Sequence, residues 1–156
     1  LINSLGDRKK LRLVTSIRSS DDRIQISVDI KDNLENDKYN DILQVIAQRG
    51  ISLDLINIFP EKQIFTIPKT AKEDVFKIFK DMNIKFTFKE ECSTIALVGA
   101  GMRGVPGVMA KIFKALNDKN IEVLQTADSH MTIWCLVKTK ELKNALNSLH
   151  KAFNLS

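Results

Sequence analysis

Val98-Gly99-Ala100-Gly101-Met102-Arg103-Gly104-Val105-Pro106-Gly107-Val108 is the stretch around which the chain is organised, and it holds four of the six glycines. An apolar run, Cys92 to Val98, comes before it, and a helical pattern from Val108 to Leu116 comes after it. This order predicts a strand, a glycine loop and the start of a helix. Free backbone N–H groups in such a loop, with the positive end of a helix behind them, favour a bound anion.

The glycine loop lies in the second copy of an internal repeat with an offset of 69 to 71 residues. The matched pairs are Ile24 with Ile95, Ile42 with Ile112, Ile46 with Leu116, Ile51 with Ile121, Ile64 with Ile133, Phe65 with Trp134 and Thr70 with Thr139. Each copy reads strand, helix, strand, strand, helix, strand, an order typical of the ferredoxin-like βαββαβ fold. We therefore expect an α+β protein with antiparallel sheets that carry their helices on one face.

Hydrophobic periodicity and turn residues predict where the elements lie. The expected strands are 11–17, 23–30, 51–58, 63–67, 84–88, 93–98, 121–125 and 131–137, with turns at 19–22 and 127–130. The expected helices are one from Ile42 that stops at Gly50, one opened by a Thr70–Glu73 capping box, one at 108–116 that buries Ile112, Phe113 and Leu116, and one capped by Thr139.

The two copies differ in completeness. The first copy is complete at 21–89, whereas the second, 90–156, lacks a final strand. The strand at 11–17 has no place in the first copy, and an unpaired sheet edge is a liability. The economical interpretation is that 11–17 completes the sheet of the second domain, so that the first domain is inserted in the second. Residues 1–10 are expected to be a flexible basic segment; a nucleic-acid-binding arm is the alternative, although this segment has no aromatic residue to stack on bases.

Composition is that of an ordinary globular protein, with 156 residues, 44% apolar residues, 28% charged residues and a net charge of +5. No apolar run approaches the ~20 residues that span a bilayer, so we expect no membrane partner. Cys92 and Cys135 lie far apart in strand-like runs and are expected to be reduced core residues of a cytoplasmic protein. Because the chain starts at Leu1 and not at Met, a fragment of a longer protein and a natural small subunit both stay open.

The loop Gly99–Gly104 fits the G-x-G-x-x-G fingerprint of dinucleotide-binding proteins. That fingerprint needs a parallel crossover sheet, whereas 121–125 and 131–137 are expected to pair as a hairpin. Pro106 suits the first turn of a helix and so leaves Gly104 in the loop. A nucleotide-dependent enzyme therefore stays an alternative and not the main interpretation. A metal site at Asp128, His130 and Cys135 matches no structural zinc spacing, and we expect none.

A free amino acid suits the loop better. Its carboxylate is expected at the free N–H groups near Met102 to Val108, and the candidate effector-binding residues of the loop are Gly101, Met102, Arg103, Gly104 and Val105. Its ammonium group needs acceptors close by, and the end of the adjacent strand supplies them at Gln125, Thr126, Ala127, Asp128 and Ser129. An ordinary turn is the alternative interpretation of Asp128-Ser129.

The stretch 98–108 resembles the signature of the second ACT domain in aspartate kinases, and Leu149–Phe153 and Ile51–Ile56 resemble other parts of the same regulatory region. The resemblance covers 11–156, and Ala127–Trp134 is most similar to the diaminopimelate-regulated class of Gram-positive bacteria. It implies feedback inhibition by an end-product amino acid (lysine, threonine or meso-diaminopimelate), homodimers formed by ACT–ACT pairing, and a kinase domain or subunit as partner. The kinase part is absent from this chain, so no catalytic residue is expected here. ATP and Mg²⁺ would bind that absent part, and no cofactor is expected in this chain.

The first copy departs from the family pattern at Asp32–Asp37, where a glycine–proline loop is expected. The first domain is therefore expected to be a weak or absent effector site, with Ile56, Asn57 and Ile58 contributing to a shared interface. A ferredoxin-like RNA-binding protein is a further alternative, although the aromatic residues are not arranged as that motif requires.

Overall fold

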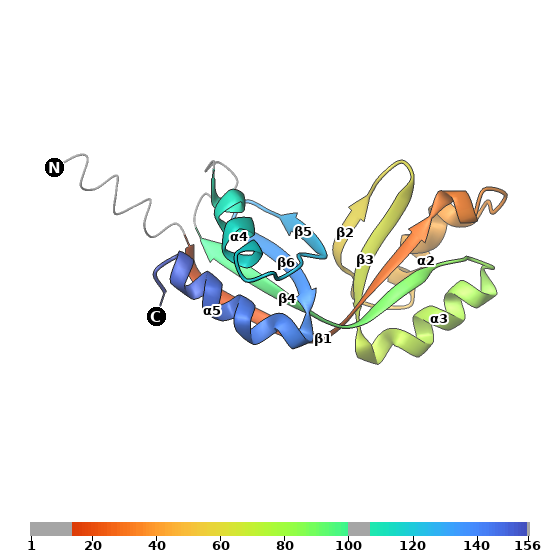
Figure 1. The fold of residues 1–156 in the computed structure, drawn as a ribbon. Coiled ribbons are helices and arrows are strands. Elements are labelled where there is room, and N and C mark those ends of the chain that lie inside the picture. The colour runs from red at the N-terminus through yellow and green to blue at the C-terminus, as the bar shows by residue number, and fades with distance from the viewer. Residues whose placement is uncertain (1–13, 100–106, 156) are drawn as a thin grey trace. The chain divides into compact units, whose positions relative to one another are not determined.

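The computed structural model describes residues 14–99 and 107–155, which form two compact units (Figure 1). One unit comprises residues 22–92, and the other comprises the described residues before Asp22 and after Cys92. Two long strands, β1 (Val14–Asp29) and β4 (Thr87–Gly99), contribute residues to both units.

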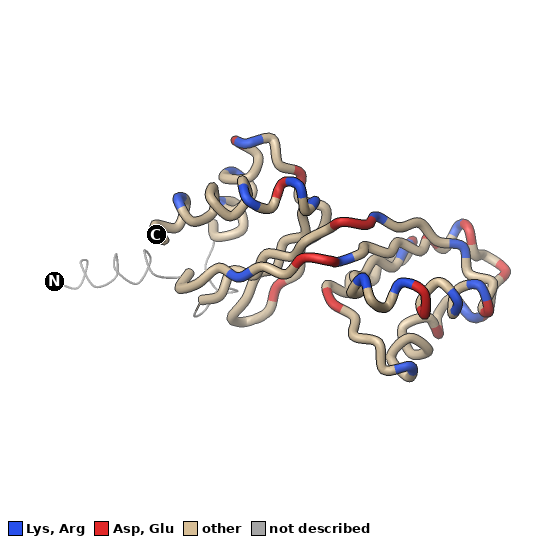
Figure 2. Tube along the Cα trace, turned by 90° about the horizontal axis from the view of Figure 1, so that it is seen from below, with Lys and Arg blue, Asp and Glu red and all other residues tan. Residues whose placement is uncertain are grey.

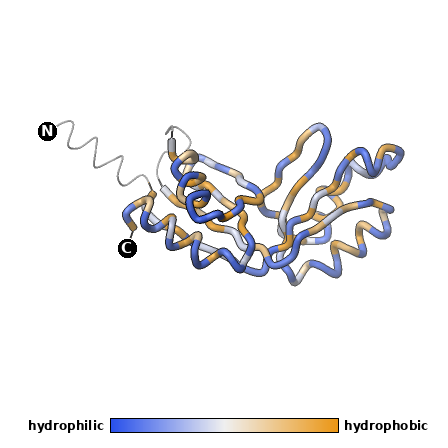
Figure 3. Tube along the Cα trace, in the orientation of Figure 1, coloured by the Kyte–Doolittle hydropathy of each residue, from blue (hydrophilic) through white to orange (hydrophobic). Residues whose placement is uncertain are grey.

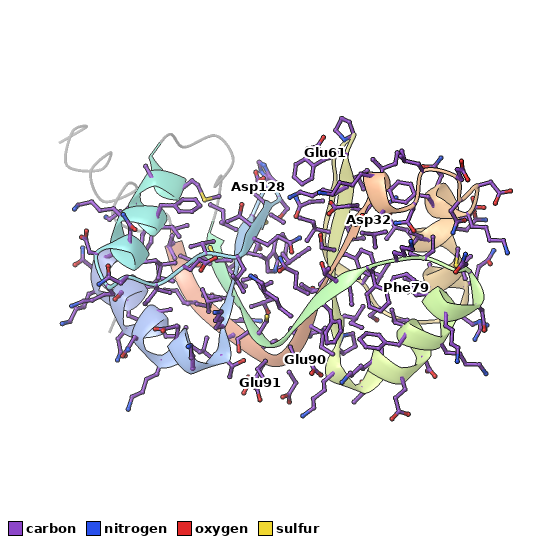
Figure 4. The ribbon with its side chains drawn as sticks, turned by 45° about the vertical axis from the view of Figure 1, so that its right-hand side comes forward. Asp32, Glu61, Phe79, Glu90, Glu91 and Asp128 are labelled. Atoms are coloured by element: carbon purple, nitrogen blue, oxygen red, sulfur yellow. The ribbon has the colours of Figure 1, made fainter. Side chains whose placement is uncertain are left out.

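The unit 22–92 has the strand order β2-β3-β1-β4, with β2 at Asp54–Ile58 and β3 at Lys62–Pro68. Strands β1 and β3 are antiparallel, from Arg23 opposite Pro68 to Asp29 opposite Lys62. Helices α2 (Ile42–Gln48) and α3 (Lys72–Asp81) bury one side each. Alternate residues of β1 join both helices in a single core, so both helices cover the same face; that core includes Ile24, Ile26, Val28, Ile42, Ile46, Phe65, Val75, Ile78 and Phe79 (Figure 4).

The other unit has the strand order β1-β4-β6-β5, with β5 at Gln125–Asp128 and β6 at Thr132–Lys138. Its helices are α4 (Val108–Asn117) and α5 (Leu142–Ala152). Its core shares no residue with the first and includes Ile95, Leu97, Ile112, Leu116, Cys135, Val137, Ala145 and Leu149. Apolar and polar residues alternate along the strands and helices of both units (Figure 3). This is the predicted ferredoxin-like, antiparallel α+β architecture.

The repeat has a slightly different register from the predicted one. The burial pattern of β3 from Lys62 matches that of β6 from Thr132, residue by residue, until the last position. Ile64 is therefore equivalent to Trp134, and fully buried Phe65 to Cys135. The predicted matches of Ile64 with Ile133 and of Phe65 with Trp134 were wrong by one residue, because residue size was matched and not the side of the sheet.

Two predicted interruptions are absent from the strands. The turn expected at 19–22 lies within β1, and the strands expected at 84–88 and 93–98 belong largely to one strand, β4. Residues 19–22 of β1 and 87–91 of β4 are all exposed, and an exposed strand lacks the alternation of buried and exposed residues by which strands are predicted. The serine and aspartate residues at 19–22 therefore indicated a turn that does not form.

The predicted helix caps were also wrong. Residues Lys69–Ala71 form a 3₁₀ turn, so α3 begins at Lys72 without a capping side chain. The same turn recurs at Thr139–Glu141 before α5, and the Thr139 hydroxyl instead lies 2.8 Å from that of Ser93. The stop at Gly50 is confirmed, with a φ of 73° and its N–H donated to the carbonyl of Ala47.

Two further predictions in the second copy differ from the structure. The strand predicted at 121–125 is shifted, because β5 runs from Gln125 to Asp128 and only residues 129–131 form the turn. On α4, Ile112 and Leu116 are buried as predicted, but Phe113 is 42% exposed.

Candidate functional site

The predicted acceptors for an ammonium group lie together on β5 and just after it. Strand β5 pairs with β6 from Gln125 opposite Leu136 to Asp128 opposite Ile133. Gln125 is buried, Thr126, Ala127 and Ser129 are half-buried, and Asp128 is exposed at the strand end (Figure 4). Because β5 is the last strand of the order, its far edge has no neighbouring strand among the described residues. A small polar ligand can reach this strand end from solvent.

A hydrogen bond brings the start of the glycine loop to this strand end. The Gly99 N–H donates to the carbonyl of Met131 at 2.9 Å, and the Ser129 N–H donates to the carbonyl of Thr132 at 2.8 Å. Gly99 is the last described residue before the loop. Gly99, at the end of β4, therefore lies beside the β5–β6 turn.

The far end of the glycine loop opens helix α4. Gly107 is its N-cap, with a left-handed φ of 92°, and the Lys111 N–H donates to the Gly107 carbonyl at 2.9 Å. The first turn of α4 has no acidic residue, so no carboxylate of that turn competes for its positive end. Gly101, Met102, Arg103, Gly104 and Val105 lie outside the described residues, and their expected contact with a carboxylate stays a prediction.

Cys135 lies opposite Thr126 on β6 and is fully buried. Burial raises the pKa of the Cys135 thiol to about 12, so the side chain stays protonated and acts as a core residue. Cys92 is likewise a buried residue, as predicted, and it forms no disulfide bond in the part of the chain that the structure describes. Residues 14–99 and 107–155 contain no group of three His, Cys, Asp or Glu side chains able to hold a metal ion.

The corresponding loop of the unit 22–92 is closed by two asparagine side chains. The Asn33 amide donates to the carbonyls of Asp29 at 2.8 Å and Lys85 at 3.0 Å, and its oxygen accepts the Lys85 N–H at 2.9 Å. Asn36 donates to the carbonyls of Met82 and Asn83 at 3.0 and 2.9 Å. We call these five bonds the asparagine clasp.

The asparagine clasp engages the amide groups of both Asn33 and Asn36 in this loop. A hollow of about 710 Å³ beside it is lined by residues 31–38 with Met82, Asn83 and Lys85, but both amide side chains are bonded to the protein backbone. The expectation of a weak or absent effector site in the first domain stays a prediction. The sequence signal for the clasp is a pair of asparagines three positions apart in this loop. From the sequence we interpreted the loop only as lacking the glycine–proline pattern.

The first-unit residues predicted for an interface lie on β2, at one end of the strand order. Ile56 and Ile58 are 45% and 65% exposed, and Phe59 just beyond the strand is 43% exposed. The preceding residue, Leu55, has a left-handed φ of 50° at an irregularity in the pairing of β2 with β3. The strand pattern did not predict this irregularity.

The antiparallel pairing of β5 with β6 does not favour a dinucleotide site, because the fingerprint requires a parallel crossover. No described helix is long and apolar enough to span a bilayer.

Comparison with known proteins gives a consistent family. Residues 87–151 match the ACT domain family. Over 145 residues the chain is 39% identical to Aspartokinase 1 of Bacillus subtilis (strain 168), covering 93% of this chain but 36% of that protein. The chain thus spans about a third of the length of curated relatives such as Aspartokinase 1 of Bacillus subtilis and the aspartokinase of Corynebacterium glutamicum.

Solved structures share the fold along almost the whole chain. A structure of aspartokinase alpha and beta subunits has a TM-score of 0.80 and 27% identity, covering 91% of this chain and 99% of that one. The ligand-free regulatory subunit of aspartate kinase from Thermus thermophilus has a TM-score of 0.76 and 21% identity, covering 90% and 99%. E. coli aspartokinase III in complex with lysine and aspartate has a TM-score of 0.68 and 16% identity, covering 90% and 33%.

Proposed function

Because this chain belongs to the ACT-domain regulatory regions of aspartate kinases, we propose that it binds an end-product amino acid and thereby inhibits the phosphorylation of aspartate by a partner kinase domain or subunit. The candidate effectors are lysine, threonine and meso-diaminopimelate. The observation that carries the proposal is the hydrogen bond from Gly99 to Met131, which joins the start of the glycine loop to the polar end of β5.

Two parts of the proposed site bind different groups of the effector. The N–H groups of residues 101–105 and the start of α4 take the carboxylate, because free N–H groups and a helix N-terminus attract an anion. Thr126, Asp128 and Ser129 take the ammonium group, since a carboxylate and two hydroxyl oxygens accept its hydrogen bonds. The side chain of the effector then extends beyond these groups and determines which amino acid binds.

Inhibition requires the effector to bind one arrangement of the regulatory region more tightly than another. Couplings of this kind are typically about 1–3 kcal/mol, which corresponds to a change in affinity of about 5- to 150-fold. The second unit supplies the proposed binding groups, whereas in the first unit the amide groups of Asn33 and Asn36 are bonded to backbone carbonyls.

A second copy of this chain is the proposed partner of β2. The exposed apolar residues Ile56 and Ile58 lie on β2, and Phe59 lies directly after it. Strand β2 ends the strand order of the described residues, and a sheet edge is stabilised by pairing with another strand. At an offset of 70 residues the second unit has Thr126, Asp128 and Ser129. The equivalent strands β2 and β5 of the internal repeat therefore differ in character, since β2 suits an apolar interface and β5 suits a polar ligand site.

Titration calorimetry of the chain with lysine, threonine and meso-diaminopimelate tests the proposal. We expect saturable heat with one of them and a loss of about tenfold or more in affinity for Asp128→Ala, because a hydrogen bond to a charged group contributes about 1.5–3 kcal/mol. Glu122→Ala is the matched control, since Glu122 is an exposed acid of the same unit before β5. Absence of heat with all three amino acids contradicts the proposed function, and equal affinities of the two variants contradict the proposed site.

The nucleotide-dependent alternative is separable by a thermal-shift measurement with NAD and ATP. Stabilisation by either nucleotide, without any response to the three amino acids, identifies the loop as a nucleotide site. The RNA-binding alternative predicts a salt-dependent gel shift with single-stranded RNA.

A further inference from the structure

Three phenylalanine rings form a connected surface on the unit 22–92. The ring of Phe76 on α3 lies 5.0 Å from that of Phe86, directly before β4, and 4.8 Å from that of Phe88 on β4. Fully buried Phe79 lies 4.6 Å from Phe86 and joins this surface to the core (Figure 4). Phe76 and Phe86 are half-buried, whereas Phe88 is 44% exposed and lies outside both cores of the described residues. We call Phe76, Phe86 and Phe88 the aromatic surface.

The fold does not require the aromatic surface. The strand order of the unit 22–92 ends at β4, and that of the other unit ends at β1. At an offset of 70 residues Ile84 corresponds to Val14, and each is buried in the core of its own unit. The same offset gives no phenylalanine in the other unit; the matched pairs are Phe76 with Leu146, Phe86 with Ser16 and Phe88 with Arg18. An aromatic ring at an exposed position that the equivalent unit fills with arginine indicates a contact outside the unit.

The charges that border the aromatic surface are balanced. The Lys72 ammonium lies 5.6 Å and 5.9 Å from the ring centroids of Phe76 and Phe88, and it pairs with the Glu90 carboxylate at 2.9 Å. Helix α3 carries three lysines and three acidic residues, so both signs of charge surround the rings (Figure 2). A border without net charge does not favour nucleic acid or an anionic membrane. An aromatic centre with a polar rim is typical of a protein–protein interface.

Two proteins are candidates for this contact, a second copy of the chain and the kinase partner. The second copy is already the proposed partner of β2, at the other end of the strand order of this unit. A second contact between copies would extend the assembly beyond a closed dimer. The larger part of Aspartokinase 1 of Bacillus subtilis lies outside the region that this chain matches. The kinase partner therefore fits the aromatic surface better.

We propose that the aromatic surface docks the kinase partner, with Phe88 as the anchor that enters an apolar pocket of it. Burial of an exposed phenylalanine is favourable, and aromatic anchors near the centre of an interface carry much of its binding energy. The unit 22–92 then holds the kinase partner, whereas the second unit binds the effector. This inference rests on the proposed kinase partner and not on effector binding.

Photo-cross-linking in the assembly of the chain with its kinase partner tests the docking site. Phe88 is replaced with p-benzoylphenylalanine, and cross-linked peptides are identified by mass spectrometry. We expect peptides of the kinase partner. The same probe in place of Leu34 is the matched control, because Leu34 is a 74% exposed apolar residue of the same unit outside α3, β2 and β4. Cross-links from position 88 only to a second copy, no cross-links, or the same kinase peptides from position 34 overturn the proposal.

Hydrogen exchange gives an independent readout that needs no effector. We expect the amides of residues 86–90 to exchange about tenfold or more slowly in the assembly than in the isolated chain. Phe88→Arg is expected to remove this difference and to fold, because Arg18 occupies the equivalent place in the other unit, whereas Leu34→Arg is expected to keep the difference. Equal exchange in the assembly and the isolated chain contradicts the docking site. Calorimetry of the isolated Phe88→Arg chain separates the two proposals, since docking can fail while effector binding stays as in the parent chain, and the reverse.

Discussion

Replacing Asn33 with alanine removes the centre of the asparagine clasp and is expected to destabilise the unit 22–92 strongly. Asn33 is 5% exposed and makes three hydrogen bonds, two donated to the carbonyls of Asp29 and Lys85 and one accepted from the Lys85 N–H. A protein hydrogen bond contributes about 1 kcal/mol on average, so the three bonds together contribute about 3 kcal/mol. The backbone groups left unpaired add to the loss.

Equilibrium unfolding in urea, followed by far-ultraviolet circular dichroism, measures this loss. With a slope of about 2 kcal/mol per molar urea, a loss of about 3 kcal/mol lowers the midpoint by about 1.5 M. Hydrogen exchange adds the location, because protection is expected to fall within 22–92 and at the Lys85 amide in particular. Tyr39 and Trp134 lie in different units and give a separate spectroscopic signal for each.

Two variants control the experiment. Glu35→Ala changes an exposed residue of the same loop and is expected to shift the free energy of unfolding by no more than about 0.5 kcal/mol. Asn33→Asp keeps the shape but places a carboxylate oxygen against two carbonyls, so it is expected to destabilise as much as alanine does. A loss below about 1 kcal/mol for Asn33→Ala refutes the view that this side chain closes the loop.

Three further outcomes are expected. The thiol pKa of Cys135 rises from 9.0 to about 12 on folding, so above pH 9 the unfolded chain releases a proton that the folded chain keeps. The free energy of unfolding therefore falls by up to about 1.4 kcal/mol per pH unit above pH 9. Urea unfolding from pH 8 to 10 is expected to show a weaker dependence of this free energy on pH for Cys135→Ala than for the parent chain. Ile58→Lys is expected to shift the chain toward the monomer in sedimentation velocity, while Lys77→Glu, at an exposed residue of α3 and not of β2, is expected to leave the association unchanged. Gly50→Ala is expected to lower stability by about 1 kcal/mol, because φ is 73° while an added Cβ meets open space, and no loss in urea unfolding would show that Gly50 is not needed for its backbone conformation.

The fold was accessible from the sequence because burial follows periodicity. The matches of Ile42 with Ile112 and of Ile46 with Leu116 place four fully buried helix residues in two separate cores. The same rule fails where strands are exposed, and residues 18–22 and 87–91 carry no alternation to be read. Local rules for helix starts failed at Thr70 and Thr139, since a 3₁₀ turn before each helix moved its first residue beyond the expected cap.

The candidate site was accessible only in part. Gln125 to Ser129 were named from their position after an apolar run, and the structure gathers them on and after β5. The approach of the glycine loop to this strand end depends on the hydrogen bond from Gly99 to Met131, between residues far apart in the chain. The clasp depends likewise on Asn33 meeting Lys85. Sequence patterns report local preference, and contacts of this range follow only from the assembled sheet.

The most direct test of the central claim is a two-dimensional amide NMR titration of the chain with the amino acid that binds. We expect saturable chemical-shift changes concentrated at Thr126, Ala127, Asp128 and Ser129, with Gly99 and the start of α4 responding at the same ligand concentration. Amides of residues 31–38 are expected to remain unchanged. Changes concentrated in the unit 22–92, or no saturable change with lysine, threonine or meso-diaminopimelate, contradict an effector site in the second ACT unit.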